Sequence, residues 1–407
     1  MTEFLQLALA LVILIAAAKL GGYISLRLGQ PSVLGELIAG LILGPSVLDT
    51  LHHTPFTSPH LDETIALLAE MGVLLLMFLA GLELHIKDLV KSGRVAALAG
   101  TLGVVFPVVM GFAVGSIFGM ATLPALFIGL VLAATSVSIS AQTLMELRVL
   151  RSRVGVGLLG AAVFDDVLVI LGLSILLALT MDGGGLAEVG LVLLRMALFL
   201  VAASAVGVLV LPRLSRRIDK LPISQGLVAF VLVTLLLFAW AAEALGSMAA
   251  ITGAFLAGLF LSRSPLRDRI QASVAVIAYG FFVPIFFISV GLVADTHMLV
   301  GQGVWLIVAM VIVAIVSKIM GAGLGARLAG FTNRESLQLG VGMMSRGEVG
   351  LIVATLGVSQ GLLSGQVFAG VVGVVIVTTL LTPPALRQLF ARPTEPVQPP
   401  VVTTAEE

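Results

Sequence analysis

Residues 159–170 read Leu-Gly-Ala-Ala-Val-Phe-Asp-Asp-Val-Leu-Val-Ile, an apolar stretch with two adjacent acids at its centre. The apolar run extends from 153 to 180, which is long enough for one helix to cross a hydrocarbon core of about 30 Å. A charged residue inside a transmembrane helix costs at least about 2.5–3.5 kcal/mol on insertion, so the presence of Asp165 and Asp166 in this span indicates a functional role. Adjacent helical residues point roughly 100° apart, so one acid can face a cavity while the other contacts a partner.

The composition of the whole chain is that of a membrane protein. Of 407 residues, 59% are hydrophobic and 11% are charged, against about 25% charged in an average soluble domain. So few charges cannot cover the surface of a water-soluble globule. The net charge is zero, which gives no case for nucleic acid as a partner. The absence of cysteine excludes disulfides, thiolate metal sites and cysteine catalysis.

Apolar runs between polar breaks predict an all-α polytopic membrane protein with 13 transmembrane helices. Helix is the expected structure because backbone groups in lipid must be hydrogen-bonded within their own segment. The predicted spans are 4–28, 31–48, 64–84, 94–119, 122–145, 153–180, 188–212, 222–245, 248–262, 271–293, 302–326, 335–360 and 364–391.

The basic residues orient these spans. With the N-terminus outside and the C-terminus in the cytoplasm, 18 of the 22 Lys and Arg fall at cytoplasmic positions. The other four, Lys19, Arg195, Lys318 and Arg346, fall within helices. The positive-inside rule predicts this asymmetry, which one missed helix in mid-chain would destroy. Residues 393–407, rich in Pro and acidic residues, are predicted to form a disordered cytoplasmic tail.

Two stretches of the chain resemble each other. Residues 35–44 read Gly-Glu-Leu-Ile-Ala-Gly-Leu-Ile-Leu-Gly, and residues 253–262 read Gly-Ala-Phe-Leu-Ala-Gly-Leu-Phe-Leu-Ser. The matched spans, second and ninth, are an odd number of helices apart, so they cross the membrane in opposite directions. A shift of seven among thirteen helices corresponds to two inverted six-helix repeats joined by one linker helix. Such repeats are typical of secondary transporters with a binding site near the midplane.

Two further spans carry polar groups at mid-membrane. Residues 134–142 read Ala-Thr-Ser-Val-Ser-Ile-Ser-Ala-Gln, and residues 340–350 read Gly-Val-Gly-Met-Met-Ser-Arg-Gly-Glu-Val-Gly. Both favour interrupted helices, around 135–138 and 345–348, whose free carbonyls can bind cations. Arg346 and Glu348 can compensate the exposed half-helix ends. The alternative for the first stretch is a face of small residues for helix packing.

The remaining buried charges suggest exchange chemistry. Paired carboxylates such as Asp165 and Asp166 bind a hard cation such as Na⁺ through oxygen and also accept protons. The expected partner of Lys318 is one of these two acids, and snorkelling to the cytoplasm is the alternative. The sequence assigns no role to Glu36, Glu70 or Arg195. It contains no phosphate loop, nucleophile elbow or metal signature, so we expect neither a cofactor nor enzymatic activity.

Four motifs resemble those of the monovalent cation:proton antiporter family. They lie at 30–40, 134–144, 159–168 and 346–352, and the likeness covers residues 1–392. Within the family the chain is similar to the NapA-type sodium/proton antiporters, which are related to the Kef transmembrane domain. The resemblance implies an NhaA-like antiporter fold with two crossed discontinuous helices. It also implies that Asp166 is the principal ion-binding acid, that Asp165 pairs with Lys318, and that Thr135 and Ser136 lie at the crossing.

The resemblance further implies a division of the chain into two functional parts and a linker. The expected dimerisation part is 1–93 (helices 1–3) and 222–299 (helices 8–10), the expected core is 94–182 (helices 4–6) and 300–392 (helices 11–13), and the linker helix 7 lies in 183–221.

We therefore expect a homodimeric antiporter of the plasma membrane that exchanges cytoplasmic Na⁺ or Li⁺ for external protons. By resemblance, two adjacent acids imply electrogenic exchange. We expect alternating access by an elevator-like movement of the core. K⁺/H⁺ exchange of the Kef type is the alternative, although Kef proteins usually carry one acid here and a cytoplasmic nucleotide-binding domain. A cation channel is less favoured, because inverted repeats with single buried charges favour alternating access over rings of pore charges.

Overall fold

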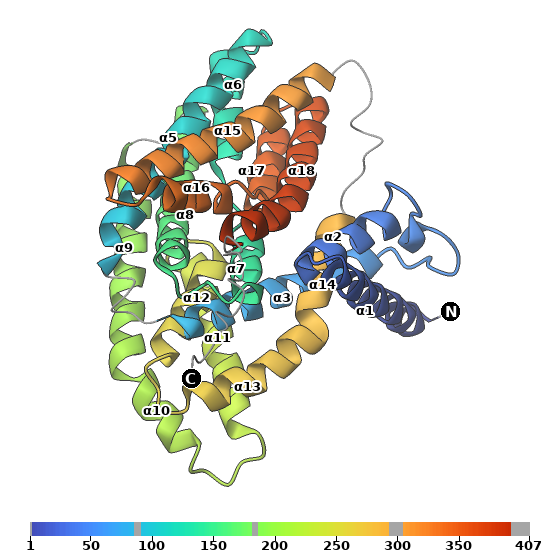
Figure 1. Cartoon of the computed structure of the whole chain (residues 1–407), viewed down its shortest axis with the longest axis vertical. Helices are drawn as coiled ribbons and strands as arrows, with labels where there is room; N and C mark the ends of the chain where they lie inside the picture. Colours follow the sequence, from blue (N-terminus) through green and yellow to red (C-terminus); the bar gives the residue numbers. More distant parts are fainter. Residues whose placement is uncertain (1, 85–90, 181–185, 293–303, 392–407) are drawn as a thin grey trace, which may run out of the picture.

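The computed structural model describes residues 2–84, 91–180, 186–292 and 304–391, and every regular element within them is helical (Figure 1). The first half contains α1 (Glu3–Arg27), α2 (Ser32–Leu43), the 3₁₀ turn η1 (Thr50–His52), α3 (Leu61–Glu83), α5 (Gly93–Ile117), α6 (Thr122–Ala133), α7 (Val137–Glu146), α8 (Arg153–Thr180), α9 (Leu186–Leu209) and α10 (Leu211–Ile218). The second half contains α11 (Gly226–Ala244), α12 (Ala250–Leu261), α13 (Arg267–Ile277), the π-helical turn η2 (Ala278–Phe282), α14 (Val283–Leu292), α15 (Val304–Leu328), α16 (Asn333–Gly342), α17 (Glu348–Ser359) and α18 (Gly365–Phe390).

Each predicted span coincides with one helix or with consecutive helices. Within the described ranges, ten helical spans are long and apolar enough to cross a membrane, and α2 and α12 are shorter apolar helices. The protein is therefore an all-helical, multi-pass membrane protein. The span predicted at 31–48 was too long, because α2 ends at Leu43, directly before Gly44-Pro45, where proline opposes continuation of a helix. The predicted tail at 393–407 lies outside the described residues.

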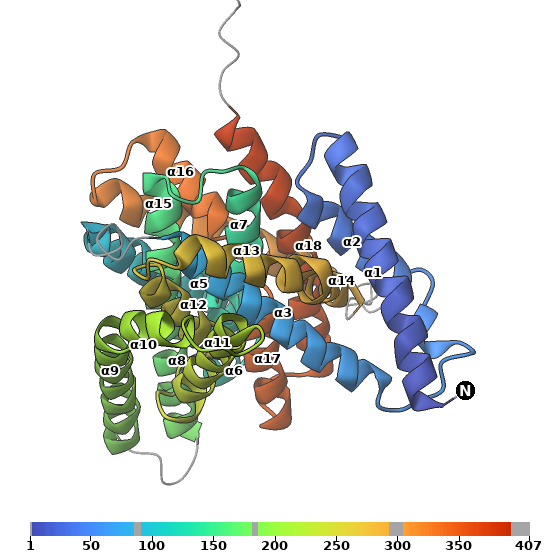
Figure 2. The ribbon, with the colours of Figure 1, turned by 90° about the horizontal axis from the view of Figure 1, so that it is seen from below.

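The helices pack in two groups. In one group α5 packs against α6, α8 and α15, while α18 contacts α7, α15, α16 and α17. In the other, α2 lies between α1 and α14, and α3 packs against α12 and α14. Helix α9 contacts α8 from the first group and α12 from the second. Figure 2 shows α1 and α2 on one side of the molecule and α9 and α10 on the other.

The two short apolar helices, α2 and α12, make matching close contacts with neighbouring helices. A Cβ atom on Gly40 of α2 would lie 2.1 Å from the carbonyl oxygen of Ile288 in α14. A Cβ atom on Gly258 of α12 would lie 2.0 Å from the carbonyl oxygen of Phe78 in α3. Small residues allow membrane helices to approach this closely. Gly40 and Gly258 occupy equivalent positions in the two similar stretches at 35–44 and 253–262, so both stretches pack against a neighbouring helix in the same way.

Candidate ion-binding site

Two interrupted helices cross in the first group of helices. Helix α6 ends at Ala133 and α7 begins at Val137, while α16 ends at Gly342 and α17 begins at Glu348. The predictions of interrupted helices are confirmed, although the first break lies slightly earlier than expected, at 134–136. The backbone N–H of Ser136 donates to the carbonyl of Ser345 at 2.9 Å. This bond joins one break directly to the other.

The unwound backbone is held by buried hydroxyl groups. Ser140 of α7 donates to the carbonyl of Gly342 at the end of α16, at 2.5 Å. From α18, the hydroxyl of Thr379 donates to the carbonyl of Arg346 at 2.8 Å, and that of Thr378 accepts from its N–H at 3.0 Å. These side chains satisfy backbone groups that a continuous helix would have paired.

Arg346 supplies positive charge at the end of α16. Its Nη1 donates to the carbonyls of Met343 and Met344 at 3.1 and 3.0 Å, and its Nη2 donates to the carbonyl of Ala314 at 2.9 Å. The residue is 1% exposed. A helix C-terminus carries partial negative charge, so the guanidinium stabilises this half-helix end. The expected place of Arg346 is thus confirmed, whereas the side chain of Glu348 lies outside the described residues.

Asp165 forms an ion pair with Lys318, which confirms the predicted contact. The Nζ atom of Lys318, on α15, donates to Oδ1 of Asp165 on α8. Both side chains have 0% exposure. Two ions removed from water are tolerated only when they stabilise each other through close contact, which these two do. The alternative of a snorkelling Lys318 is excluded.

Asp166 points in another direction and meets a residue that the sequence did not single out. The Oγ1 atom of Thr252, on α12, donates to Oδ2 of Asp166 at 3.1 Å. Asp166 is 7% exposed and Thr252 is 3% exposed. Adjacent acids therefore contact different groups of helices: Asp165 its own group, and Asp166 the other. A single hydroxyl in an apolar helix gave no signal that could have identified Thr252.

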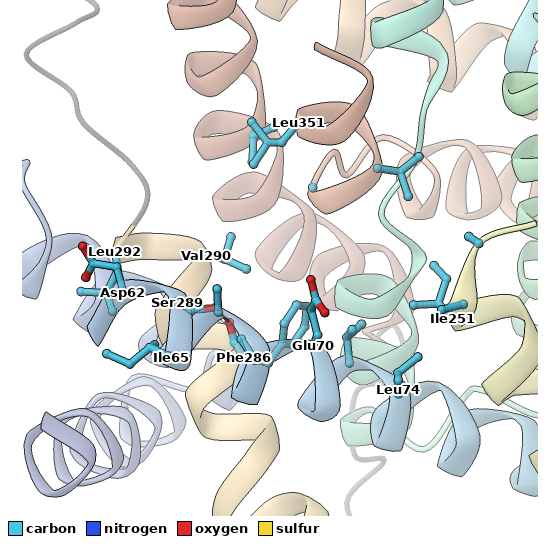
Figure 3. Close-up of a pocket in the computed structure, with 18 of the residues that line it drawn as sticks. Asp62, Ile65, Glu70, Leu74, Ile251, Phe286, Ser289, Val290, Leu292 and Leu351 are labelled. Carbon is cyan, nitrogen blue, oxygen red and sulfur yellow. Dashed lines mark hydrogen bonds between the residues drawn. The ribbon is translucent and has the colours of Figure 1, made fainter. Parts of the chain in front are cut away.

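A cavity of about 870 Å³ opens between the two groups. Its wall includes Ile170, one turn after Asp166, and Ile251, directly before Thr252. It also includes four carboxylates, those of Asp49, Asp62, Glu70 and Glu243, and neither Lys nor Arg among its described residues. Figure 3 shows the Glu70 side chain projecting from α3 into this space. Glu70, to which the sequence assigned no role, is thus one of the residues that line this cavity.

At the other end of α2 the two groups are joined. The backbone N–H and the hydroxyl of Ser32 donate to the carboxylate of Glu146 at 2.7 and 2.5 Å. Gln142 also donates to this carboxylate, at 2.9 Å. Glu146 is the last residue of α7, so a carboxylate from one group caps the N-terminus of a helix in the other. The cavity thus lies at the C-terminal end of α2, and the contact with Glu146 joins the two groups at its N-terminal end.

A membrane protein with crossed, interrupted helices and adjacent buried acids belongs to the class of secondary transporters. Comparison with known proteins specifies the family. Residues 11–392 match the family described as "Sodium/hydrogen exchanger, transmembrane", and the chain belongs to this family. It is 41% identical over 390 residues to the Na(+)/H(+)-K(+) antiporter GerN of Bacillus cereus, covering 95% of this chain and 96% of that protein.

Two further similarities agree with this assignment. The chain is 34% identical over 378 residues to a Na(+)/H(+) antiporter of Enterococcus hirae, covering 93% of this chain and 96% of that protein. The solved structure of the sodium proton antiporter MjNhaP1 from Methanocaldococcus jannaschii superposes with a TM-score of 0.69 at 17% identity, covering 95% and 97% of the two chains. At this low identity the structural match shows the fold alone.

Proposed function

We propose that this protein is a secondary active antiporter that exchanges cytoplasmic Na⁺ or Li⁺ for external protons. The observation that carries the proposal is the pair of adjacent buried acids. Asp165 is neutralised by Lys318, while Asp166 lies one turn before Ile170, which lines a cavity whose wall bears four carboxylates. A carboxylate close to such a cavity binds either a hard cation or a proton, and competition between the two is the basis of exchange.

Family membership supports cation/proton exchange as the reaction, and the relatives named above carry Na⁺ and H⁺ in their names. Potassium is the second candidate cation, because GerN is described as a Na(+)/H(+)-K(+) antiporter. Within the proposal, Thr135 and Ser136 lie at the crossing and contribute oxygen atoms to the transported ion. Asp166 is the principal ligand, and Asp165 belongs to the same site. Lys318, Arg346 and Glu348 compensate charge.

The proposed mechanism is alternating access by an elevator-like movement of one group of helices against the other. Residues 94–182 and 300–392 form the moving core, and residues 1–93 and 222–299 form the static part through which two copies dimerise. In this proposal the chain crosses the membrane thirteen times, in two inverted six-helix repeats joined by a linker helix. The matching contacts of Gly40 and Gly258 support the repeat, since related helices pack through equivalent glycines.

The proposed setting is the plasma membrane, with the N-terminus outside and the C-terminus in the cytoplasm. The cavity then opens to the outside, where the proton supply lies, and the Glu146–Ser32 contact closes the cytoplasmic end. The proton gradient supplies the energy, and the protein acts as a transporter and not as an enzyme. With two acids and one lysine, more protons than cations can move in each cycle, which makes exchange electrogenic.

The proposal is tested by reconstituting the purified protein into proteoliposomes with a pH-sensitive dye. We expect proton movement on addition of Na⁺ or Li⁺ and much less on addition of K⁺. A response to K⁺ alone would favour the Kef-type alternative. Cation flux without proton movement would indicate a channel, and no flux of either kind would refute the antiporter assignment.

A further inference from the structure

The hydroxyl of Thr252 is directed away from its own helix. Thr252 occupies the third position of α12, and the residue that precedes this helix, Ala249, has no side chain able to cap it. A threonine near a helix N-terminus commonly bonds to the free N–H groups of that turn. Here its Oγ1 donates to the carboxylate of Asp166 on α8. The local helix therefore does not explain this bond.

The position of the bond connects it to the exchange reaction. Ile170, one turn beyond Asp166, and Ile251, adjacent to Thr252, both line the cavity. The N-terminal turn of α12 also carries partial positive charge, which favours an ionised carboxylate at this place. The hydroxyl and the helix end therefore hold the Asp166 carboxylate in one orientation, next to residues that line the cavity.

We propose that Thr252 is a positioning residue for cation exchange, which fixes the Asp166 carboxylate in the orientation that receives the cation from the cavity. This inference rests on the proposed function. A carboxylate accepts up to about four hydrogen bonds or ligands, so the Thr252 bond leaves other lone pairs for the cation. An oriented ligand loses less freedom on binding, which increases affinity without any new contact.

Three single variants test the proposal by Na⁺-driven proton movement in proteoliposomes. Thr252→Val removes the hydroxyl and preserves the shape. We expect its apparent KM for Na⁺ to rise about tenfold, equivalent to about 1.4 kcal/mol, with the maximal rate within about twofold of the unmodified protein. Thr252→Ser retains the hydroxyl and should restore the KM to within about threefold.

Thr234→Val is the matched control. Thr234 lies in the apolar helix α11 and is 4% exposed, but its hydroxyl donates to Phe230 of the same helix at 2.8 Å. Its loss should leave the KM unchanged. An unchanged KM in Thr252→Val, no recovery in Thr252→Ser, or an equal rise in Thr234→Val would each overturn the inference. Inactivity of the unmodified protein would instead refute the proposed function itself.

Discussion

Replacing Lys318 by glutamine tests the buried ion pair most directly. Glutamine keeps most of the volume but removes the charge that neutralises Asp165. Both partners have 0% side-chain exposure, so water cannot take the place of the missing ammonium. Asp165 must then remain as a buried charge without its counter-ion or take up a proton.

The size of the effect follows from this burial. Removing one partner of a buried pair typically costs about 3–5 kcal/mol. The glutamine amide can still donate a neutral hydrogen bond to Asp165, so we expect Lys318→Gln to lie near the lower end, at about 3 kcal/mol. Most proteins are stable by only about 5–15 kcal/mol, so this loss is large.

The double variant separates charge from packing. In Asp165→Asn/Lys318→Gln both charges are gone, and two amides of similar shape remain. We expect the double variant to be more stable than Lys318→Gln alone, with a coupling energy of at least about 1.5 kcal/mol. Unfolding of the four proteins of this cycle in detergent measures the coupling. Equal losses for the single and double variants would show that Lys318 stabilises the fold by packing alone.

The same variant tests the transport role of Lys318. If the pair contributes a second proton to each cycle, exchange responds to membrane potential. Lys318→Gln should then lose that response while it continues to exchange Na⁺ for protons. Proteoliposomes with an imposed potassium diffusion potential provide the measurement, and exchange that stays equally voltage-sensitive would assign Lys318 a structural role only.

Three further predictions concern other parts of the molecule. Asp166→Asn should abolish Na⁺-driven proton movement and leave unfolding nearly unchanged, because it removes the charge and preserves the volume; substantial residual exchange would contradict the assignment. Gly258→Val should prevent stable folding, since a Cβ atom there would lie 2.0 Å from the carbonyl oxygen of Phe78, and a normal yield of folded protein by gel filtration would refute the packing argument. Hydrogen bonds to Asp49 and Asp62 raise the pKa of His52 above 6.5, although partial burial opposes this shift. A pKa that is raised in the folded state stabilises the folded protein fully below about pH 6.5. This stabilisation is lost as the pH rises through the pKa of the folded state. The stability difference between the unmodified protein and His52→Gln should therefore shrink at alkaline pH, and a difference independent of pH would exclude this ion-pair contribution.

The pattern of hydropathy predicted most of the helices of the fold. Runs of about 20 apolar residues must be helical in lipid, because no other local structure satisfies their backbone groups, so the predicted spans coincide with helices. The unpredicted α10 (Leu211–Ile218) is short and basic, and it followed an apolar run from which hydropathy did not separate it. The length of α2 was overestimated because apolar residues continue beyond the proline that ends the helix.

The candidate site was predictable in part. The acids at 165 and 166, Lys318 and Arg346 stand out because charge is costly in a membrane, so their positions alone mark them. The two breaks were recognisable from clustered hydroxyls and glycines. Sequence reasoning left open which aspartate pairs with Lys318, and the family resemblance indicated Asp165. Thr252 and Glu146 gave no comparable signal, because a hydroxyl in a helix and a carboxylate at a helix end are both ordinary features.

The sequence by itself therefore determined that this protein spans a membrane, approximately where its apolar helices lie, and which residues place charge inside them. These properties depend on composition and local spacing, because each helix satisfies its own backbone. The tertiary structure alone decided that Asp165 and Asp166 contact different groups of helices, that Thr252 donates to Asp166, and that Glu146 caps α2. Such contacts join residues 86 and 114 positions apart, and they depend on the packing of helices whose relative positions are not encoded in either segment alone.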